Sequence, residues 1–159
     1  MFIVRKYTVI APISLSIALL TTGCSESKTS QCQRLVKVIN QGTSLIDNNK
    51  GEQVTTSLGL SRDLQTVTKS IQELKLADPE LQKFQSNFAK VFDNLSQAIA
   101  KAAQALGTTK TAEASSSGRA KIRTARTDID SALTAAAKTA GKQSDTFGNQ
   151  LNEYCSKTQ

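Results

Sequence analysis

Residues 60–106 read LSRDLQTVTKSIQELKLADPELQKFQSNFAKVFDNLSQAIAKAAQAL, and this stretch decides the fold. Apolar residues in its first half step by four, three, four and three positions: Leu60, Leu64, Val67, Ile71 and Leu74. A similar seam resumes at Leu81, Phe84, Phe88, Val91, Leu95, Ala98 and Ala102. This spacing is typical of helices that pack against partner helices. We therefore predict two consecutive amphipathic helices, the first ending near Ala77 and the second finishing at Leu106–Gly107.

The boundary between these two helices carries a strong start signal. Asp78 is followed by Pro79 and Glu80. An aspartate caps the first free N–H groups of a helix, and proline is favoured at the first helical position. An acidic residue in the first turn also interacts favourably with the positive end of the helix dipole. We expect the second of the two helices to begin at Pro79 with Asp78 as its N-cap.

Two further helices are predicted on either side of this central pair. The preceding helix carries apolar residues at helical spacing, namely Cys32, Leu35, Val36, Ile39 and Ile46. It ends in the turn-forming residues 47–51. The following one comes after a Ser/Thr-rich loop over 108–118 and carries Ala125, Ile129, Leu133, Ala136, Ala140, Phe147, Leu151 and Tyr154. Gly141 and Gly148 lie within it, and either glycine is expected to bend the helix or to divide it in two.

The composition agrees with an all-α chain. Aromatic residues make up 4% of the sequence, Trp is absent and Pro occurs twice, which disfavours a β-sandwich or barrel. Helices joined by short connections alternate in direction. We predict an all-α fold, an antiparallel up-and-down four-helix bundle over residues 32–157, after an N-terminal signal helix.

The N-terminus has the order of an export signal. Arg5 and Lys6 precede an uncharged, mostly apolar stretch over 7–20, and small residues follow up to Cys24. The segment Leu20-Thr21-Thr22-Gly23-Cys24 resembles the lipobox of bacterial lipoproteins. The resemblance covers residues 1–24 only. It implies a lipoprotein signal peptide over 1–23, diacylglycerol and a further fatty acyl group such as palmitate on Cys24, and a polar tether over 24–31. An ordinary signal peptide with an incidental cysteine, or an uncleaved anchor, is the alternative.

Three cysteines, at positions 24, 32 and 155, are an odd number for an exported chain. Lipidation of Cys24 leaves Cys32 and Cys155, which we expect to form a disulfide; two buried thiols are the alternative. In an up-and-down bundle the first helix begins where the fourth one ends. The two cysteines occupy those two places, and Cys24 keeps that end within about 30 Å of the membrane.

Catalytic chemistry is not indicated. The chain has no His, so the usual general base and the commonest transition-metal ligand are missing. It also lacks a Gly-x-Ser-x-Gly elbow, a phosphate-binding glycine loop and a Cys-x-x-Cys pair. We expect no enzyme activity, no metal site and no cofactor. Removing Arg5 and Lys6 from the 20 basic residues leaves 18 against 13 acidic ones, a net charge of +5 that does not favour nucleic acid as a partner.

Two residue sets remain as candidate sites. Phe84, Phe88, Phe92, Phe147 and Tyr154 either belong to the core, the more frequent role of such a stripe, or line an apolar pocket. The bundle is expected to be thick at these rings and thin at its alanine-rich end. The second set is the only basic cluster, which we place at the end away from the tether: Arg119, Lys121, Arg123 and Arg126. It is either a solvated helix face or a surface for an acidic envelope protein or a polyanionic polymer.

These features predict a membrane-tethered lipoprotein on the exported side of the cell envelope. Its expected role is a binding or scaffolding module that acts through its helical surface. The alternative is a carrier of a small apolar ligand or lipid, held in an aromatic-lined region of the bundle. The sequence leaves open which of the two membranes holds the anchor.

Overall fold

The computed structural model describes residues 26–49, 54–109 and 115–157, except for the side chains of residues 54–56 and 108. These residues form four helices and no strand: α1 (Lys28–Asn48), α2 (Val54–Gln72), α3 (Pro79–Thr109) and α4 (Ser116–Ser156). The prediction of an all-α fold is therefore confirmed. The predicted signal peptide, and Cys24 with it, lie outside the described residues.

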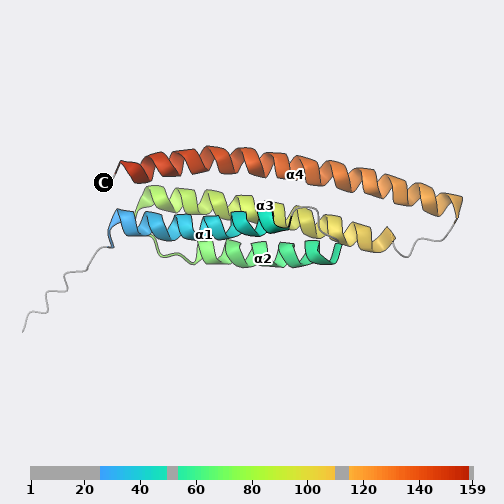
Figure 1. Ribbon diagram of the computed structural model, residues 1–159, viewed down its shortest axis with the longest axis horizontal. Coiled ribbons are helices and arrows are strands. Elements are labelled where there is room, and N and C mark those ends of the chain that lie inside the picture. The colour runs from blue at the N-terminus through green and yellow to red at the C-terminus, as the bar shows by residue number, and fades with distance from the viewer. Residues whose placement is uncertain (1–25, 50–53, 110–114, 158–159) are drawn as a thin grey trace, which may run out of the picture.

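The four helices lie side by side along the longest axis of the molecule (Figure 1). α3 packs against both α2 and α4, whereas α1 packs mainly on α2. The helices differ in length, with 21, 19, 31 and 41 residues from α1 to α4. Figure 1 shows that α3 and α4 continue beyond the ends of α1 and α2. One end of the bundle thus contains four helices, and the other, which we call the distal end, contains only α3 and α4.

The core follows the seams predicted from the sequence. Its largest fully enclosed side chains come from α1, α2 and α3: Leu35, Leu64, Ile71, Leu81, Phe88 and Phe92. Burial of a side chain of this size contributes about 1.5–3 kcal/mol, so these six residues supply much of the drive to fold. α4 adds few buried residues for its length, among them Ile129, Ala140 and Leu151.

Gly42 marks a very close approach between α1 and α3. A Cβ atom on this residue would lie 2.6 Å from Cζ of Phe92 and 3.0 Å from Cγ1 of Val67. The Phe92 ring therefore occupies the space that any larger residue at position 42 would need. Glycine is required here for packing.

α2 and α3 are joined at two levels by polar contacts. Near the start of α2, Ser61 Oγ donates to the carbonyl oxygen of Ser96 at 3.0 Å, and Ser96 Oγ donates to that of Ser61 at 2.9 Å. Near the end of α2, Gln85 Nε2 lies 2.6 Å from the carbonyl oxygen of Ile71. Early residues of α3 thus face late residues of α2, so these two helices run in opposite directions.

The end of α2 differs from the prediction for reasons that involve distant residues. α2 ends at Gln72 rather than near Ala77, because the chain turns there to bring Leu76 into the core, where it is 7% exposed. The side-chain amide of Gln85 donates to carbonyl oxygens at the end of α2 and in the turn that follows, including that of Leu74 at 2.8 Å. Gln31 Oε1 then accepts the N–H of Ala77 at 2.7 Å.

The remaining boundaries are set by local capping. α1 begins at Lys28, so residues 28–31 are helical and the tether predicted over 24–31 is too long. The cause is Ser27, whose hydroxyl accepts the N–H of Ser30 at 3.2 Å. Ser115 caps α4 in the same way, with the N–H of Gly118 at 3.0 Å, which shortens the predicted loop. α4 is one continuous helix through Gly141 and Gly148, and Figure 1 shows it gently curved.

Candidate functional site

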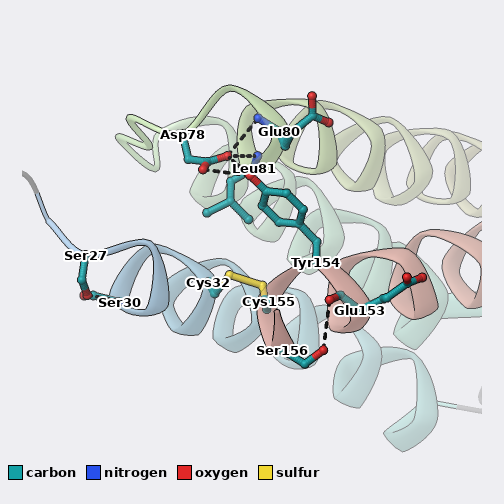
Figure 2. The surroundings of a disulfide bond; sticks show 10 residues. All are labelled: Ser27, Ser30, Cys32, Asp78, Glu80, Leu81, Glu153, Tyr154, Cys155 and Ser156. Carbon is teal, nitrogen blue, oxygen red and sulfur yellow. Dashed lines mark hydrogen bonds between the residues drawn. A yellow bond between two sulfur atoms is a disulfide. The ribbon is translucent and has the colours of Figure 1, made fainter. Parts of the chain in front are cut away.

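The two predicted disulfide cysteines are bonded to each other. Cys32 lies in the second turn of α1 and Cys155 in the last turn of α4, with their sulfur atoms 2.04 Å apart and their Cα atoms 6.0 Å apart. Figure 2 shows this bond between the two helices, beside the start of α3. The disulfide prediction is confirmed, and the alternative of two buried thiols is wrong. We call this region, which contains Cys32, Cys155, Asp78 and Tyr154, the disulfide end.

Asp78 connects three parts of the disulfide end. Its Oδ1 accepts the N–H groups of Glu80 at 2.9 Å and Leu81 at 3.0 Å, which confirms its predicted role as the N-cap of α3. Its carboxylate also accepts the hydroxyl of Tyr154, 3.0 Å from each oxygen (Figure 2). The same aspartate therefore begins α3 and holds the last turn of α4.

The pKa of Asp78 reflects these contacts. Burial raises the pKa of its carboxyl, but the hydrogen bonds from Leu81, Tyr154 and Glu80 and the nearby charge of Lys28 outweigh burial and hold the pKa below its usual value. The Nζ atom of Lys28 lies 3.4 Å from the centre of the Tyr154 ring, a cation–π contact. The charged aspartate, the tyrosine and the lysine form one mutually supporting group.

The start of α1 is tied to the turn between α2 and α3. Gln31 is 4% exposed, and its Oε1 accepts the N–H groups of Ala77 and Asp78 while its Nε2 donates to the carbonyl oxygen of Glu26. Arg34 pairs with Glu26 and donates to the carbonyl oxygen of Lys75 at 2.8 Å. The disulfide end is thus rigid on both sides of the sulfur bridge. Sequence reasoning missed Gln31 and Arg34, because nothing in their local pattern points to a turn more than 40 residues later.

The predicted basic cluster lies in the first part of α4, in the two-helix distal end. All four of its side chains are exposed, and none forms an ion pair with a residue that the structure describes. At about 100° per residue, Arg119, Arg123 and Arg126 share one side of the helix while Lys121 points to the opposite side. The sequence spacing of the four residues already implies these two directions. The cluster is better described as an arginine stripe, formed by Arg119, Arg123 and Arg126, plus the separate Lys121.

Four of the five predicted aromatic residues pack in two pairs between α3 and α4. The ring centres of Phe84 and Tyr154 are 6.0 Å apart, as are those of Phe88 and Phe147, the latter pair edge to face. Phe88 and Phe92 are each 2% exposed. Their rings form part of the core, which favours the core interpretation of this set over an open apolar pocket.

Two hollows on the surface were not predicted. The larger, about 1030 Å³, is an open groove between α1 and α2, lined by amide side chains and by apolar ones that include Val36, Leu45 and Val67. The second lies between α3 and α4 in the alanine-rich region and has a volume of about 440 Å³. Grooves depend on the tilt and separation of neighbouring helices, which a single sequence does not specify.

Among the described residues there is no group of three or more His, Cys, Asp or Glu side chains that would hold a metal ion. None of the described helices combines the length and the apolar character needed to cross a bilayer. Comparisons of the chain with protein-family models, with curated proteins and with solved structures found no match.

Proposed function

We propose that this chain is a lipid-tethered lipoprotein of the cell envelope whose up-and-down bundle binds or scaffolds an anionic partner. Lipid on Cys24 anchors the disulfide end to a membrane, and the basic cluster meets the partner at the distal end. The partner is an acidic envelope protein or a polyanionic polymer. The chain acts by binding and performs no catalysis.

The observation that carries the proposal is the disulfide between Cys32 and Cys155. It joins the start of α1 to the end of α4, as alternating helix directions require. Cys24 precedes the first residue of α1, Lys28, by a few residues, which span at most about 14 Å when extended. A lipid anchor on Cys24 would therefore hold the whole disulfide end close to the bilayer.

The length of α4 separates the anchor from the basic cluster. From Cys155 back to Arg119 the helix rises about 54 Å at 1.5 Å per residue. With the bundle standing upright on the bilayer, that distance exceeds the Debye length of about 8 Å at physiological salt, so the anchoring membrane's own surface charge barely reaches the cluster. The four basic side chains are exposed and lack ion pairs with described residues, so they are available to an anionic partner.

The anchor is tested by fatty-acid labelling in a bacterial host. Cells producing the wild-type chain or the C24S variant grow with an alkyne analogue of palmitate, and both proteins are then fractionated. We expect label and membrane association for the wild type and neither for C24S. An unlabelled wild-type chain, or C24S that still fractionates with membranes, would remove the tether from the proposal.

The partner is tested by co-purification from native membranes with the variant R119E/K121E/R123E/R126E. The matched control reverses four exposed lysines elsewhere, K37E/K69E/K75E/K90E, so that both variants have the same net charge. We expect the first variant to lose a partner that the control retains. If both variants keep every partner, or both lose it equally, the basic cluster is not the binding surface.

A further inference from the structure

Three adjoining hollows form one groove along α4; the first two lie between α3 and α4, and the third is lined by residues of α4 alone. Their volumes are about 440, 250 and 410 Å³. The first two share Asn94 as a lining residue, and the last two share Thr139 and Gln143. On α4 the groove extends from Asp128 to Phe147, about 28 Å along the helix axis. That length equals about five helical turns, enough for another helical surface to lie along it.

The groove exists because the side chains between the helices are short. The hollow of about 440 Å³ is lined by short side chains from α3 and α4, among them Ala98, Ala102, Ala105 and Ala132, together with Ile129. These side chains leave the space between the two helices unfilled, and no residue of α1 or α2 lines this hollow. A pair of helices cannot enclose an apolar seam by itself, so this seam is stabilised when further helices cover it.

The two sides of the groove carry opposite charges at the same hollow. Lys101 lies on the α3 side and Asp128 on the α4 side, and both line the hollow of about 440 Å³. Both residues are exposed, and neither forms an ion pair with a described residue. A partner that fits here presents a negative charge opposite α3 and a positive charge opposite α4. A second copy of the same chain meets both requirements.

We propose that a second copy of this chain docks on the groove, with a two-fold axis parallel to α3 and α4. Each α3 then faces α4 of the other copy, so Lys101 meets Asp128 of the second copy, and the pair occurs twice. The two hairpins together form a four-helix arrangement around an alanine-rich core. An antiparallel dimer centred on this hollow would instead set Lys101 against Lys101 and Asp128 against Asp128.

The parallel direction also fits the proposed tether, and this one point rests on the proposed function. In a parallel dimer the disulfide ends of both copies lie on the same side, so two lipid anchors enter one membrane. The arginine stripes of both copies then lie together at the other end. A pair of stripes increases the affinity for a repeating polyanion through simultaneous binding.

Charge exchange tests the dimer on the purified full chain, with molar mass measured by sedimentation equilibrium over a range of concentrations. K101D makes both sides of the groove negative, and D128K makes both sides positive. We expect each single variant to dissociate roughly tenfold more readily than the wild type, since two exposed pairs turn repulsive. K69D is the control: Lys69 is exposed on α2, no residue of which lines the groove, and this variant should match the wild type.

An equimolar mixture of K101D and D128K decides whether the charges act between copies. In the mixed dimer each negative side faces a positive one, so we expect the mixture to recover the wild-type dimer mass. The double variant K101D/D128K should recover it as well. Circular dichroism confirms that each variant is folded.

Three results would overturn the second copy as occupant: a monomeric wild-type chain at all concentrations, a mixture that stays monomeric, or a monomer carrying bound lipid by native mass spectrometry. The measurement is repeated on C24S, which cannot be lipidated at that position. Dimers of C24S would support the proposed dimer even if fatty-acid labelling failed. A wild-type chain that is labelled but monomeric would contradict the dimer and still support the lipid tether.

Discussion

The hydroxyl of Tyr154 donates to the carboxylate of Asp78 and lies 3.0 Å from each of its oxygens. Tyr154 directly precedes the disulfide cysteine of α4, whereas Asp78 caps α3, 76 residues earlier in the chain. This contact adds a non-covalent link to the sulfur bridge and connects α4 to α3, the helix that contributes more buried residues to the core than any other described helix. The disulfide end is therefore held by two linkages that can be removed separately.

Replacing Tyr154 by Phe isolates the hydrogen bond. The Y154F ring keeps its position against Phe84 and beneath Lys28, but Asp78 loses one of its donors. We expect the free energy of unfolding to fall by about 1–2 kcal/mol, as is typical for a hydrogen bond to a charged group. Urea denaturation measures the change. An unchanged midpoint with an unchanged slope would show that solvent replaces this bond at no cost.

The stability of the chain should depend on the charge of Asp78. Its pKa is lowered in the folded state, so its contribution is complete above the unfolded value of about 3.9 and disappears as the pH falls through the lower folded value. The D78N variant keeps a capping oxygen but has no charge to lose. The stability difference between wild type and D78N should therefore be constant above about pH 5 and shrink below about pH 4.

Thermal unfolding of the wild type and of D78N, measured at pH values from above about 5 to below about 4, gives that stability difference. Glu26 and Glu153 also have lowered pKa values, through Ser30 and Lys157 respectively, but they titrate equally in the two proteins and cancel. A difference that stays the same at every pH would mean that the Asp78 contacts do not need its charge.

The two glycines at positions 42 and 141 should respond to alanine in opposite ways. A Cβ on Gly42 would overlap the Phe92 ring, so we expect G42A to destabilise the chain by about 1–3 kcal/mol. Gly141 is exposed within α4, and a Cβ there meets nothing within 4 Å. We expect G141A to stabilise the chain by about 0.5–1 kcal/mol through helix propensity. Urea denaturation of both variants should give shifts of opposite sign, and two shifts in the same direction would contradict the packing described at Gly42.

Removing the disulfide should have the largest effect. For a loop of this length the chain-entropy account predicts a loss of about 4–5 kcal/mol in C32S/C155S. The sequence separation of 123 residues means that nearly all of the described chain lies inside the loop. Urea denaturation measures the loss, and mass analysis of the unreduced protein should find no free thiol at either position. A loss below about 1 kcal/mol would indicate that the unfolded chain already keeps its ends close.

Local signals in the sequence located some of these features well. Asp78, Pro79 and Glu80 mark the start of α3 through short-range capping chemistry, and the structure begins α3 at Pro79. The cysteine pair followed from the odd number of cysteines, which needs no knowledge of packing. The core side chains of α2 and α3 followed from their spacing, since a helix has a fixed period.

Features that depend on distant contacts were not predictable. α2 stops at Gln72 because Gln85 and Leu76 reorganise the following turn, and their effect appears only once α3 is in place. The early start of α1 depends on Ser27, which is one of several serines in that segment. The α3–α4 groove depends on how closely these two helices approach each other, which their sequences do not specify. Seam spacing specifies which side of a helix is buried but not how much of it has a neighbour.

The covalent closure between Cys32 and Cys155 has one further consequence. Any single cut of the backbone between these two residues leaves both pieces joined through sulfur, so the cleaved protein keeps its mass except for one added water. A protease that nicks the chain once would change nothing on a non-reducing gel, and the two fragments would separate only after reduction. In a compartment rich in proteases and poor in reductants, such a protein keeps both fragments attached after a first cut.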